Sequence, residues 1–247
     1  MSSQTIEGNL KYVRERMLRA CKSVGRDPNE VKLLLATKTV SPNNINRAID
    51  LGEMLIGESK AQEFRDKYPE INTDHIDAHF IGHLQTNKVN SVLRNTNYIH
   101  SVDRLRLGNA LHKRAEKIGK KLDILVQVNT TYEESKFGVA PEETLQLIEQ
   151  LAQLDALNIK GLMTIGRLSA DPEEARVYFR RLKSIQEQVQ AQNYAGVEMK
   201  ELSMGMSRDY DVAIEEGATI VRVGTAIFGE RMYPDSYYWN EQLNIDE

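Results

Sequence analysis

The sequence predicts an α/β fold, a single (β/α)8 TIM barrel with an extra N-terminal helix before its first strand. The main observation is an alternation that persists along the chain: short apolar runs of strand length are each followed by an amphipathic helical segment or by the tail. The length of 247 residues also suits one barrel, and no Pro/Gly/Ser-rich linker divides the chain. A doubly wound open sheet is the alternative that the same alternation allows.

The predicted elements follow one another in a regular order. Apolar residues at helical spacing indicate the first helix, and they are Ile6, Leu10, Val13, Met17 and Cys21. The predicted strands are residues 31–38, 54–58, 78–82, 98–101, 122–129, 159–165, 200–204 and 220–224. The intervening helices begin near residues 42, 59, 87, 105, 141, 172 and 209.

We therefore expect residues 1–247 to form one domain, with a leading helix within 1–25 and a C-terminal tail at 230–247. The aromatic residues of the tail, within 232–239, are expected to pack on the barrel.

Composition excludes several functional classes. The chain is 40% hydrophobic and 28% charged, which is typical of a globular protein, and its net charge of -4 gives no reason to expect nucleic acid or a membrane as a partner. Cys21 is the only cysteine, so an internal disulfide and a cysteine-based zinc site are excluded. No stretch approaches the roughly 18 apolar residues of a membrane span, and the first residues do not form a signal peptide. We expect a cytoplasmic protein.

Lys38 stands where the first predicted strand ends, the position at which barrels carry their functional groups. A lysine partly desolvated at such a strand end has a lowered pKa, and its amine can form a Schiff base with a carbonyl compound. The simpler interpretation is a lysine that extends from a strand end into solvent, and position alone favours it.

The loops after the seventh and eighth predicted strands contain features that suit an anion. Ser207 is placed as the N-cap of the next helix, where free N–H groups can bind a phosphate. Gly224 allows the backbone to approach a ligand, and Thr225 adds a hydroxyl group. A phosphate site and ordinary caps and turns both remain open for these residues.

Arg222 lies inside the apolar strand at 220–224. A guanidinium that points into a barrel needs a partner, because burying an unpaired charge is costly. One interpretation is a salt bridge to a core carboxylate. The other is a hydrogen bond from Arg222 to a ring nitrogen of a bound heterocycle.

Four further residues have competing interpretations. His79 and His83 should lie on a strand that runs into a loop, so they are not expected to share a metal ion, and we expect no metal site. His79 is predicted to line the barrel mouth. Glu58 could bond a ligand or cap a helix. Lys136 could be a second aldehyde acceptor or a phosphate neighbour, although a solvated loop lysine is the simpler interpretation.

Six motifs in fixed order resemble the pyridoxal phosphate homeostasis protein family, and they occupy residues 35–39, 56–58, 79–88, 134–138, 202–207 and 221–229. The resemblance extends from the first helix to about Gly229. It implies a barrel like the N-terminal domain of alanine racemase (fold type III) and pyridoxal 5'-phosphate (PLP) held as a Schiff base on Lys38.

The resemblance also implies the other contacts of the cofactor. Ser207, Gly224 and Thr225 would lie at the phosphate and Arg222 at the pyridine nitrogen. We assign His79 and Ser203, which lie within the matching motifs, to the cofactor site as well.

The chain departs from the family pattern at two places. The family usually shows Gly-Glu-Asn-Tyr, whereas Ser59 and Lys60 follow Glu58 here, so a ring contact of that asparagine is not carried over. The usual tryptophan before the third motif is Ala78, which we interpret as a local packing change.

An arginine at the ring nitrogen predicts muted chemistry. Arginine can only donate a hydrogen bond, so the ring nitrogen stays unprotonated and PLP becomes a weaker electron acceptor. Racemases of this fold type add a tyrosine base from a second domain and a partner subunit, and we expect no second domain in this chain. We therefore assign no catalytic residue.

The leading hypothesis is a monomeric, non-catalytic PLP carrier or regulator in vitamin B6 and amino-acid homeostasis, with PLP-dependent apoenzymes as candidate recipients. One alternative is a weak fold-type III racemase or lyase. The other is a Schiff-base aldolase that acts on a sugar phosphate.

Overall fold

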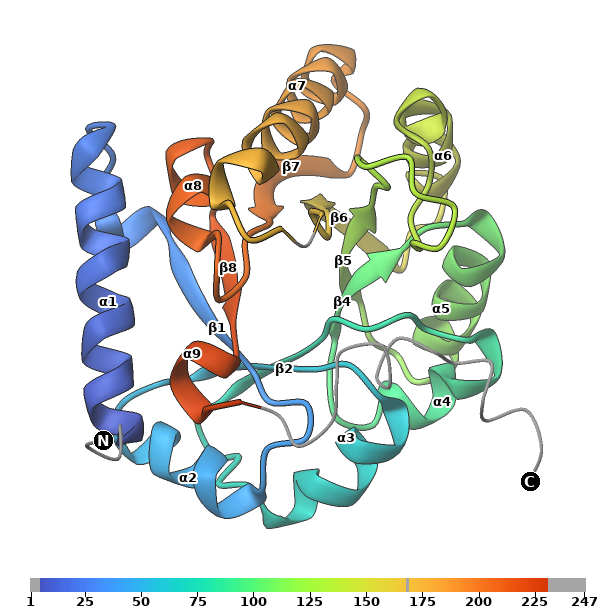
Figure 1. Cartoon of the computed structure of the whole chain (residues 1–247). Helices are drawn as coiled ribbons and strands as arrows, with labels where there is room; N and C mark the ends of the chain where they lie inside the picture. Colours follow the sequence, from blue (N-terminus) through green and yellow to red (C-terminus); the bar gives the residue numbers. More distant parts are fainter. Residues whose placement is uncertain (1–4, 168, 231–247) are drawn as a thin grey trace.

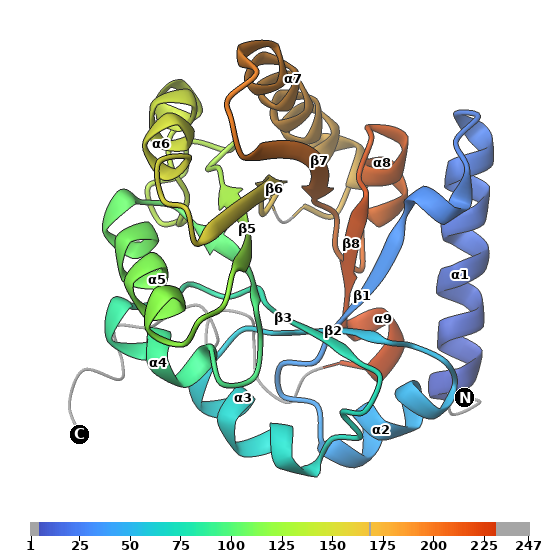
Figure 2. The same cartoon turned by 180° about the vertical axis from the view of Figure 1, so that it is seen from behind.

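Strand β8 (Ile220–Val223) pairs in parallel with strand β1 (Lys32–Ala36), and this pairing closes the sheet into a barrel. The computed structural model describes residues 5–167 and 169–230. Between β1 and β8 the strands are β2 (Leu55–Glu58), β3 (Asp77–Phe80), β4 (Tyr98–Val102), β5 (Leu122–Gln127), β6 (Leu157–Met163) and β7 (Val197–Ser203). They pair in sequential order, and helices surround them (Figures 1 and 2). The predicted (β/α)8 barrel is confirmed, and the open sheet is excluded.

The helices are α1 (Ile6–Ser23), α2 (Pro42–Asp50), α3 (Ala61–Lys67), α4 (Val89–Val92), α5 (Leu105–Lys117), α6 (Thr144–Leu151), α7 (Arg176–Gln192), α8 (Tyr210–Glu215) and α9 (Thr225–Phe228). The predicted leading helix is α1, and each predicted helix is present within a few residues of its expected start. Helix α9 is not among the predicted helices, because a helix of four residues is too short to show a helical period.

The strands alternate between two buried environments. Leu33 and Leu35 of β1 point outward into the apolar layer between strands and helices, where Cys21 of α1 is also buried. Leu34 points the other way, and it lies against Gly57 of β2, where a Cβ atom would be 2.4 Å from Leu34 Cδ2. The inside of the barrel is therefore a second, narrower core.

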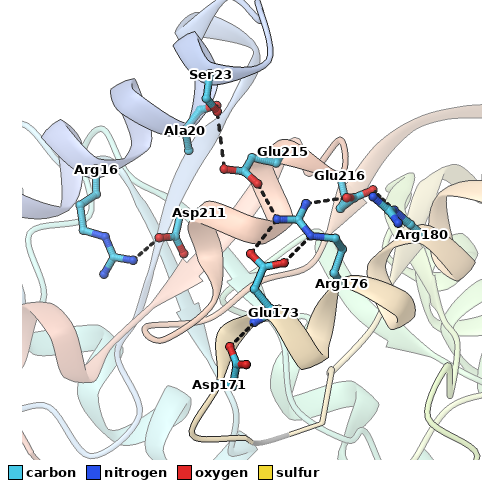
Figure 3. Close-up of polar contacts among 10 residues, drawn as sticks. All are labelled: Arg16, Ala20, Ser23, Asp171, Glu173, Arg176, Arg180, Asp211, Glu215 and Glu216. Carbon is cyan, nitrogen blue, oxygen red and sulfur yellow. Dashed lines mark hydrogen bonds and ion pairs between the residues drawn. The ribbon is translucent and has the colours of Figure 1, made fainter.

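Ion pairs join the outer helices near β8. Arg176 at the start of α7 lies between Glu173, Glu215 and Glu216, with Nη2–Glu215 Oε2 at 2.7 Å and Nη1–Glu216 Oε1 at 2.6 Å (Figure 3). Arg16 of α1 pairs with Asp211 of α8. Helix α8 is thus held from both sides directly after the loop that follows β7.

Some expectations concern parts of the chain that the structure does not describe. The predicted aromatic tail lies outside the described residues.

No helix in the described part of the chain is long and apolar enough to cross a membrane. Within residues 5–167 and 169–230, no group of three or more His, Cys, Asp or Glu side chains is placed to hold a metal ion.

The close approach of β6 and β7 makes Gly161 a sensitive position. A Cβ atom at Gly161 would lie 1.8 Å from the carbonyl oxygen of Glu201, a backbone atom that cannot move without breaking the ladder. We predict that Gly161→Ala lowers the free energy of unfolding by about 3 kcal/mol, measured by urea denaturation.

The matched control for this substitution is Gly8→Ala in α1. A Cβ atom there meets only the Thr5 hydroxyl at 3.3 Å, and alanine favours a helix, so the change should stay within about 1 kcal/mol. Equal stability of the two variants would contradict the packing argument.

Candidate functional site

The predicted cofactor residues from the ends of β1, β7 and β8 meet at one mouth of the barrel. Lys38 follows β1, Ser207 follows β7, and Gly224 follows β8 directly. A Cβ atom on Gly224 would lie 2.9 Å from the carbonyl oxygen of Ala36, the last residue of β1. Parallel pairing of β8 with β1 and β7 brings these strand ends together, and only glycine fits between them.

Ser207 connects the loops after β7 and β8. Its Oγ accepts hydrogen bonds from the backbone N–H groups of Gly224 (3.2 Å) and Ala226 (3.3 Å). The expectation that Ser207 is the N-cap of the next helix is wrong, because α8 begins at Tyr210 with Asp209 as its N-cap. A further turn, in which Asp209 Oδ1 accepts the N–H of Met206, separates Ser207 from the helix.

The neighbouring glycine and threonine differ in exposure. Gly224 is buried, whereas Thr225 is exposed at the first position of α9. The exposed Thr225 hydroxyl can donate a hydrogen bond to a small ligand, and the backbone at Gly224 lets that ligand come close.

Lys38 lies in a tight turn after β1 and is only 8% exposed. The N–H of Val40 donates to the carbonyl of Thr37 across this turn (3.0 Å). Thr39 has φ of 64°, which is unusual for a β-branched residue, and its N–H donates to Glu63 Oε2 (2.8 Å). The backbone that carries Lys38 is therefore fixed by contacts on both sides.

A cluster of ionic side chains, in which Glu58 is buried and Glu63 and Lys67 are half-buried, stabilises this turn from behind. Glu58 Oε1 accepts from the Thr37 hydroxyl (2.7 Å) and from Lys67 Nζ (3.2 Å). Lys67 also donates to the carbonyl of Thr37 (3.0 Å) and to Glu63 Oε2 (2.7 Å). Glu58 therefore does not cap a helix, and its Oε2 has no hydrogen-bond partner among the described residues.

Glu63 and Lys67 are not among the residues predicted from the sequence. Their spacing of four residues on a helix is a common ion-pair signal, but such pairs usually lie in solvent. The partial burial of Lys67 and its contact with Thr37, the residue before Lys38, depend on how α3 packs behind β2.

Arg222 is buried inside the barrel, with 5% of its surface exposed. It donates from Nη1 to Ser203 Oγ (2.7 Å) and from Nη2 to the carbonyl of Thr164 (2.9 Å). Its hydrogen-bond partners are thus a hydroxyl and a carbonyl, not the core carboxylate of the first interpretation. Burial lowers the pKa of Arg222 to about 10, although the charge of Asp209 acts in the opposite direction. The guanidinium remains charged at neutral pH.

The prediction that His79 lines the barrel mouth is wrong. His79 lies in the barrel interior, with 2% of its surface exposed. Its Nδ1 is 2.8 Å from Nε2 of His100, and its Nε2 faces Asp77 at the start of β3. His83 is in the following loop, where its ring stacks on Phe137 at 3.7 Å between centroids. The prediction failed because the pattern located the strand but not the direction of this side chain.

The remaining positions have local partners. Lys136 Nζ donates to Glu133 Oε1 (3.0 Å) in its own loop and to the carbonyl of Gly166 (3.1 Å). Ala78 is buried in the outer apolar layer, in register with Ile56 of β2. The backbone of Ser59 packs closely against Gly82. A Cβ atom on Gly82 would lie 1.9 Å from the Ser59 carbonyl oxygen.

Comparison with known proteins identifies the family. The family model for the N-terminal domain of alanine racemase matches residues 46–232. A protein of Aquifex aeolicus named pyridoxal phosphate homeostasis protein is 44% identical over 224 residues, which cover 91% of this chain and 97% of that protein. The chain belongs to the pyridoxal phosphate homeostasis protein family.

Solved structures agree with this assignment. The structure of PipY from Synechococcus elongatus PCC7942 with PLP bound superposes with a TM-score of 0.76 at 31% identity, and the match covers 88% of this chain and all of PipY, 100%. An alanine racemase of Clostridium difficile 630 has a TM-score of 0.66 at 16% identity, with 90% of this chain and 58% of the racemase covered. The likeness to the racemase is one of fold alone.

The cluster behind Lys38 predicts a pH-dependent stability. Burial raises the pKa of Glu58 above its ordinary value of 4.5, so the folded protein binds this proton more tightly than the unfolded chain does. The stability that Glu58 contributes is therefore lost as pH rises from about 4.5 through the folded-state pKa. Glu58→Gln removes this loss, and its free energy of unfolding should rise relative to wild type over that range, measured by urea denaturation at several pH values.

Glu63→Gln is the matched comparison. Burial alone would raise the pKa of Glu63, but the bonds from Lys67 and from the Thr39 N–H together lower it below 4.5. The wild-type stability from Glu63 is present above pH 4.5 and is lost as pH falls through the folded-state pKa. This variant should therefore lose stability relative to wild type as pH rises toward 4.5, and the same sign for both variants would contradict the assignment.

Proposed function

We propose that this chain binds PLP at the C-terminal mouth of its barrel, with the cofactor held as a Schiff base on Lys38. The observation that carries the proposal is the contact between Ser207 and Gly224, beside the end of β1 and close to the buried Arg222. A fixed, largely buried lysine next to two converging loops suits an aldehyde that also carries a phosphate. The PipY structure with bound PLP and the names of the relatives support the same ligand.

Each residue has a role in this proposal. Ser207, Gly224 and Thr225 hold the phosphate, since they supply hydroxyl and backbone groups where the loops after β7 and β8 meet. Arg222 donates to the pyridine nitrogen. Its bonds to Ser203 and Thr164 engage only Nη1 and Nη2, and a guanidinium carries further N–H groups.

The residues of this chain favour retention of the cofactor over turnover. PLP supplies an aldehyde and an electron-accepting ring when it is bound. Arg222 stays charged at neutral pH and so cannot give the ring nitrogen a proton, which weakens the ring as an electron acceptor. We assign no catalytic residue and propose a role in the homeostasis of PLP and amino acids.

The wider role follows from the same proposal. We propose one PLP-binding domain that acts in the cytoplasm as a monomer, with PLP-dependent apoenzymes as recipients of the cofactor. The name of the relatives, pyridoxal phosphate homeostasis protein, supports the role in PLP homeostasis.

A weak racemase or lyase is the second candidate function, because the family model that matches residues 46–232 describes a domain of alanine racemase. Exchange of the α-proton of alanine or serine in deuterated water separates the two. Exchange at the rate of free PLP supports the carrier, and a much faster rate supports the enzyme. The sugar-phosphate aldolase is disfavoured by the family membership.

Lys38→Ala tests the proposal directly. The Lys38 amine and an aldehyde condense with loss of water, so the wild-type protein with PLP should show the absorption band of a Schiff base. The variant should lose this band, and borohydride reduction followed by peptide mass analysis should place the adduct on Lys38 in wild type.

Lys136→Ala is the control, since Lys136 is the other candidate acceptor and its amine already bonds Glu133 and Gly166. The control should keep the full band. A band that survives in Lys38→Ala, or an adduct on Lys136, would refute the proposed attachment site.

A further inference from the structure

A row of polar side chains crosses the inside of the barrel from Arg222 to Asp77. Arg222 Nη1 is 2.7 Å from Ser203 Oγ, which is 3.1 Å from His100 Nδ1. His100 Nε2 is 2.8 Å from His79 Nδ1, and His79 Nε2 is 3.2 Å from Asp77 Oδ2. Strands β4 and β7 are not neighbours in the sheet, so the contact between His100 and Ser203 passes through the barrel interior.

The two ends of the row have opposite hydrogen-bonding character. Arg222 can only donate, and an ionised Asp77 can only accept. The contact with His79, at 3.2 Å, lowers the pKa of Asp77, so this carboxylate stays charged. The interior members, Ser203, His100 and His79, are at most 2% exposed, so water is not available to replace a missing partner.

These ends determine the order of the protons between them. Ser203 accepts from Arg222, which leaves its own hydroxyl proton to donate to His100 Nδ1. A neutral His100 then carries its proton on Nε2 and donates to His79 Nδ1. His79 in turn carries its proton on Nε2, which faces the carboxylate of Asp77.

The opposite order is unfavourable. It would turn an unprotonated His79 Nε2 toward the Asp77 carboxylate, so that two acceptors would face each other at 3.2 Å. Charging His100 is opposed by burial, which lowers its pKa well below the ordinary value, by a charge on His79 and by the charge of Arg222.

We propose that this row positions Arg222 for the pyridine ring of PLP. Asp77 fixes the proton order, the two histidines transmit it, and Ser203 holds the guanidinium. The inference rests on the proposed function, since the ring contact is what the row positions. Ser203, His100, His79 and Asp77 are thus positioning residues, and Asp77 acts from the opposite end of the barrel.

The far end of the row is open to solvent. Asp77 lines a polar cavity of about 590 Å³ at the N-terminal mouth of the barrel, together with Lys32, Tyr98, Asp123 and Glu201. The ring of Tyr98 stacks on His79 at 4.0 Å between centroids, and its hydroxyl bonds Glu201, which also pairs with Lys32 (2.9 Å). Tyr98, held by Glu201, keeps the His79 ring in place. A change of charge at Asp77 therefore alters the proton order of the row and does not move His79.

The first test is NMR of the protein without PLP, with ¹⁵N-labelled histidines. Wild type should show His100 neutral with its proton on Nε2, and His79 with a proton on the Nε2 that faces Asp77. Asp77→Asn should give a mixture of tautomers, because an asparagine amide can also donate and so permits the opposite order. Asp123→Asn, at a carboxylate in the same cavity but outside the row, should keep the wild-type pattern.

The second test is PLP binding, followed by the absorption of the bound cofactor. Ser203→Ala removes the hydroxyl that holds Arg222 and should weaken binding about threefold to tenfold, with a shifted absorption maximum. Ser203→Thr keeps the hydroxyl and should restore both. Asp77→Asn should shift the absorption in the same direction as Ser203→Ala, and Asp123→Asn should not.

Two results would overturn the inference. One is a proton on Nδ1 of His100 in wild type, a result that stands even if the Ser203 variants do not fold. The other is an unchanged affinity and spectrum in a folded Ser203→Ala variant. Failure of wild type to bind PLP would instead refute the proposed function, and the NMR result would still decide whether the row is ordered.

Discussion

The pairing of β8 with β1 is the constraint on which the candidate site depends. It brings the last residue of β1 within van der Waals contact of Gly224, and the loop from β7 then reaches the same place through Ser207. None of these contacts is local in sequence. A barrel that failed to close would leave Lys38 on one edge of a sheet and Arg222 on the other.

Charge is buried on both sides of this closure, and it is stabilised in two different ways. Behind Lys38, Glu58 and Glu63 share the ammonium group of Lys67, so opposite charges offset part of the desolvation cost. Inside the barrel, Arg222 has a hydroxyl and a carbonyl as partners. These partners are neutral, and the charge of Asp209 partly offsets the positive charge of Arg222, which still suits a residue that donates to the ring of an anionic ligand.

The row of polar side chains inside the barrel extends from Arg222 to Asp77, at the N-terminal mouth. In most barrels the interior is filled by apolar layers, whereas here Ser203 and two histidines replace part of that core. Such a network is costly unless its members have partners. Arg222, Ser203 and His100 have hydrogen-bond partners within the row, and His79 Nε2 faces the Asp77 carboxylate at 3.2 Å. A row of polar contacts thereby connects the two mouths of the barrel.

The sequence by itself determined the barrel, the leading helix and the positions of Lys38, Gly224 and Arg222 at or near strand ends, because alternating periodicity and strand length are local properties. The family could also be recognised from the sequence, because the order of its motifs can be read without a structure. Only the tertiary structure decided the partners: that Ser207 bonds Gly224 and does not cap α8, that Lys67 lies behind Lys38, and that His79 points inward to His100. Each of these contacts joins segments distant in the chain, and its existence depends on which face a side chain takes when the barrel closes.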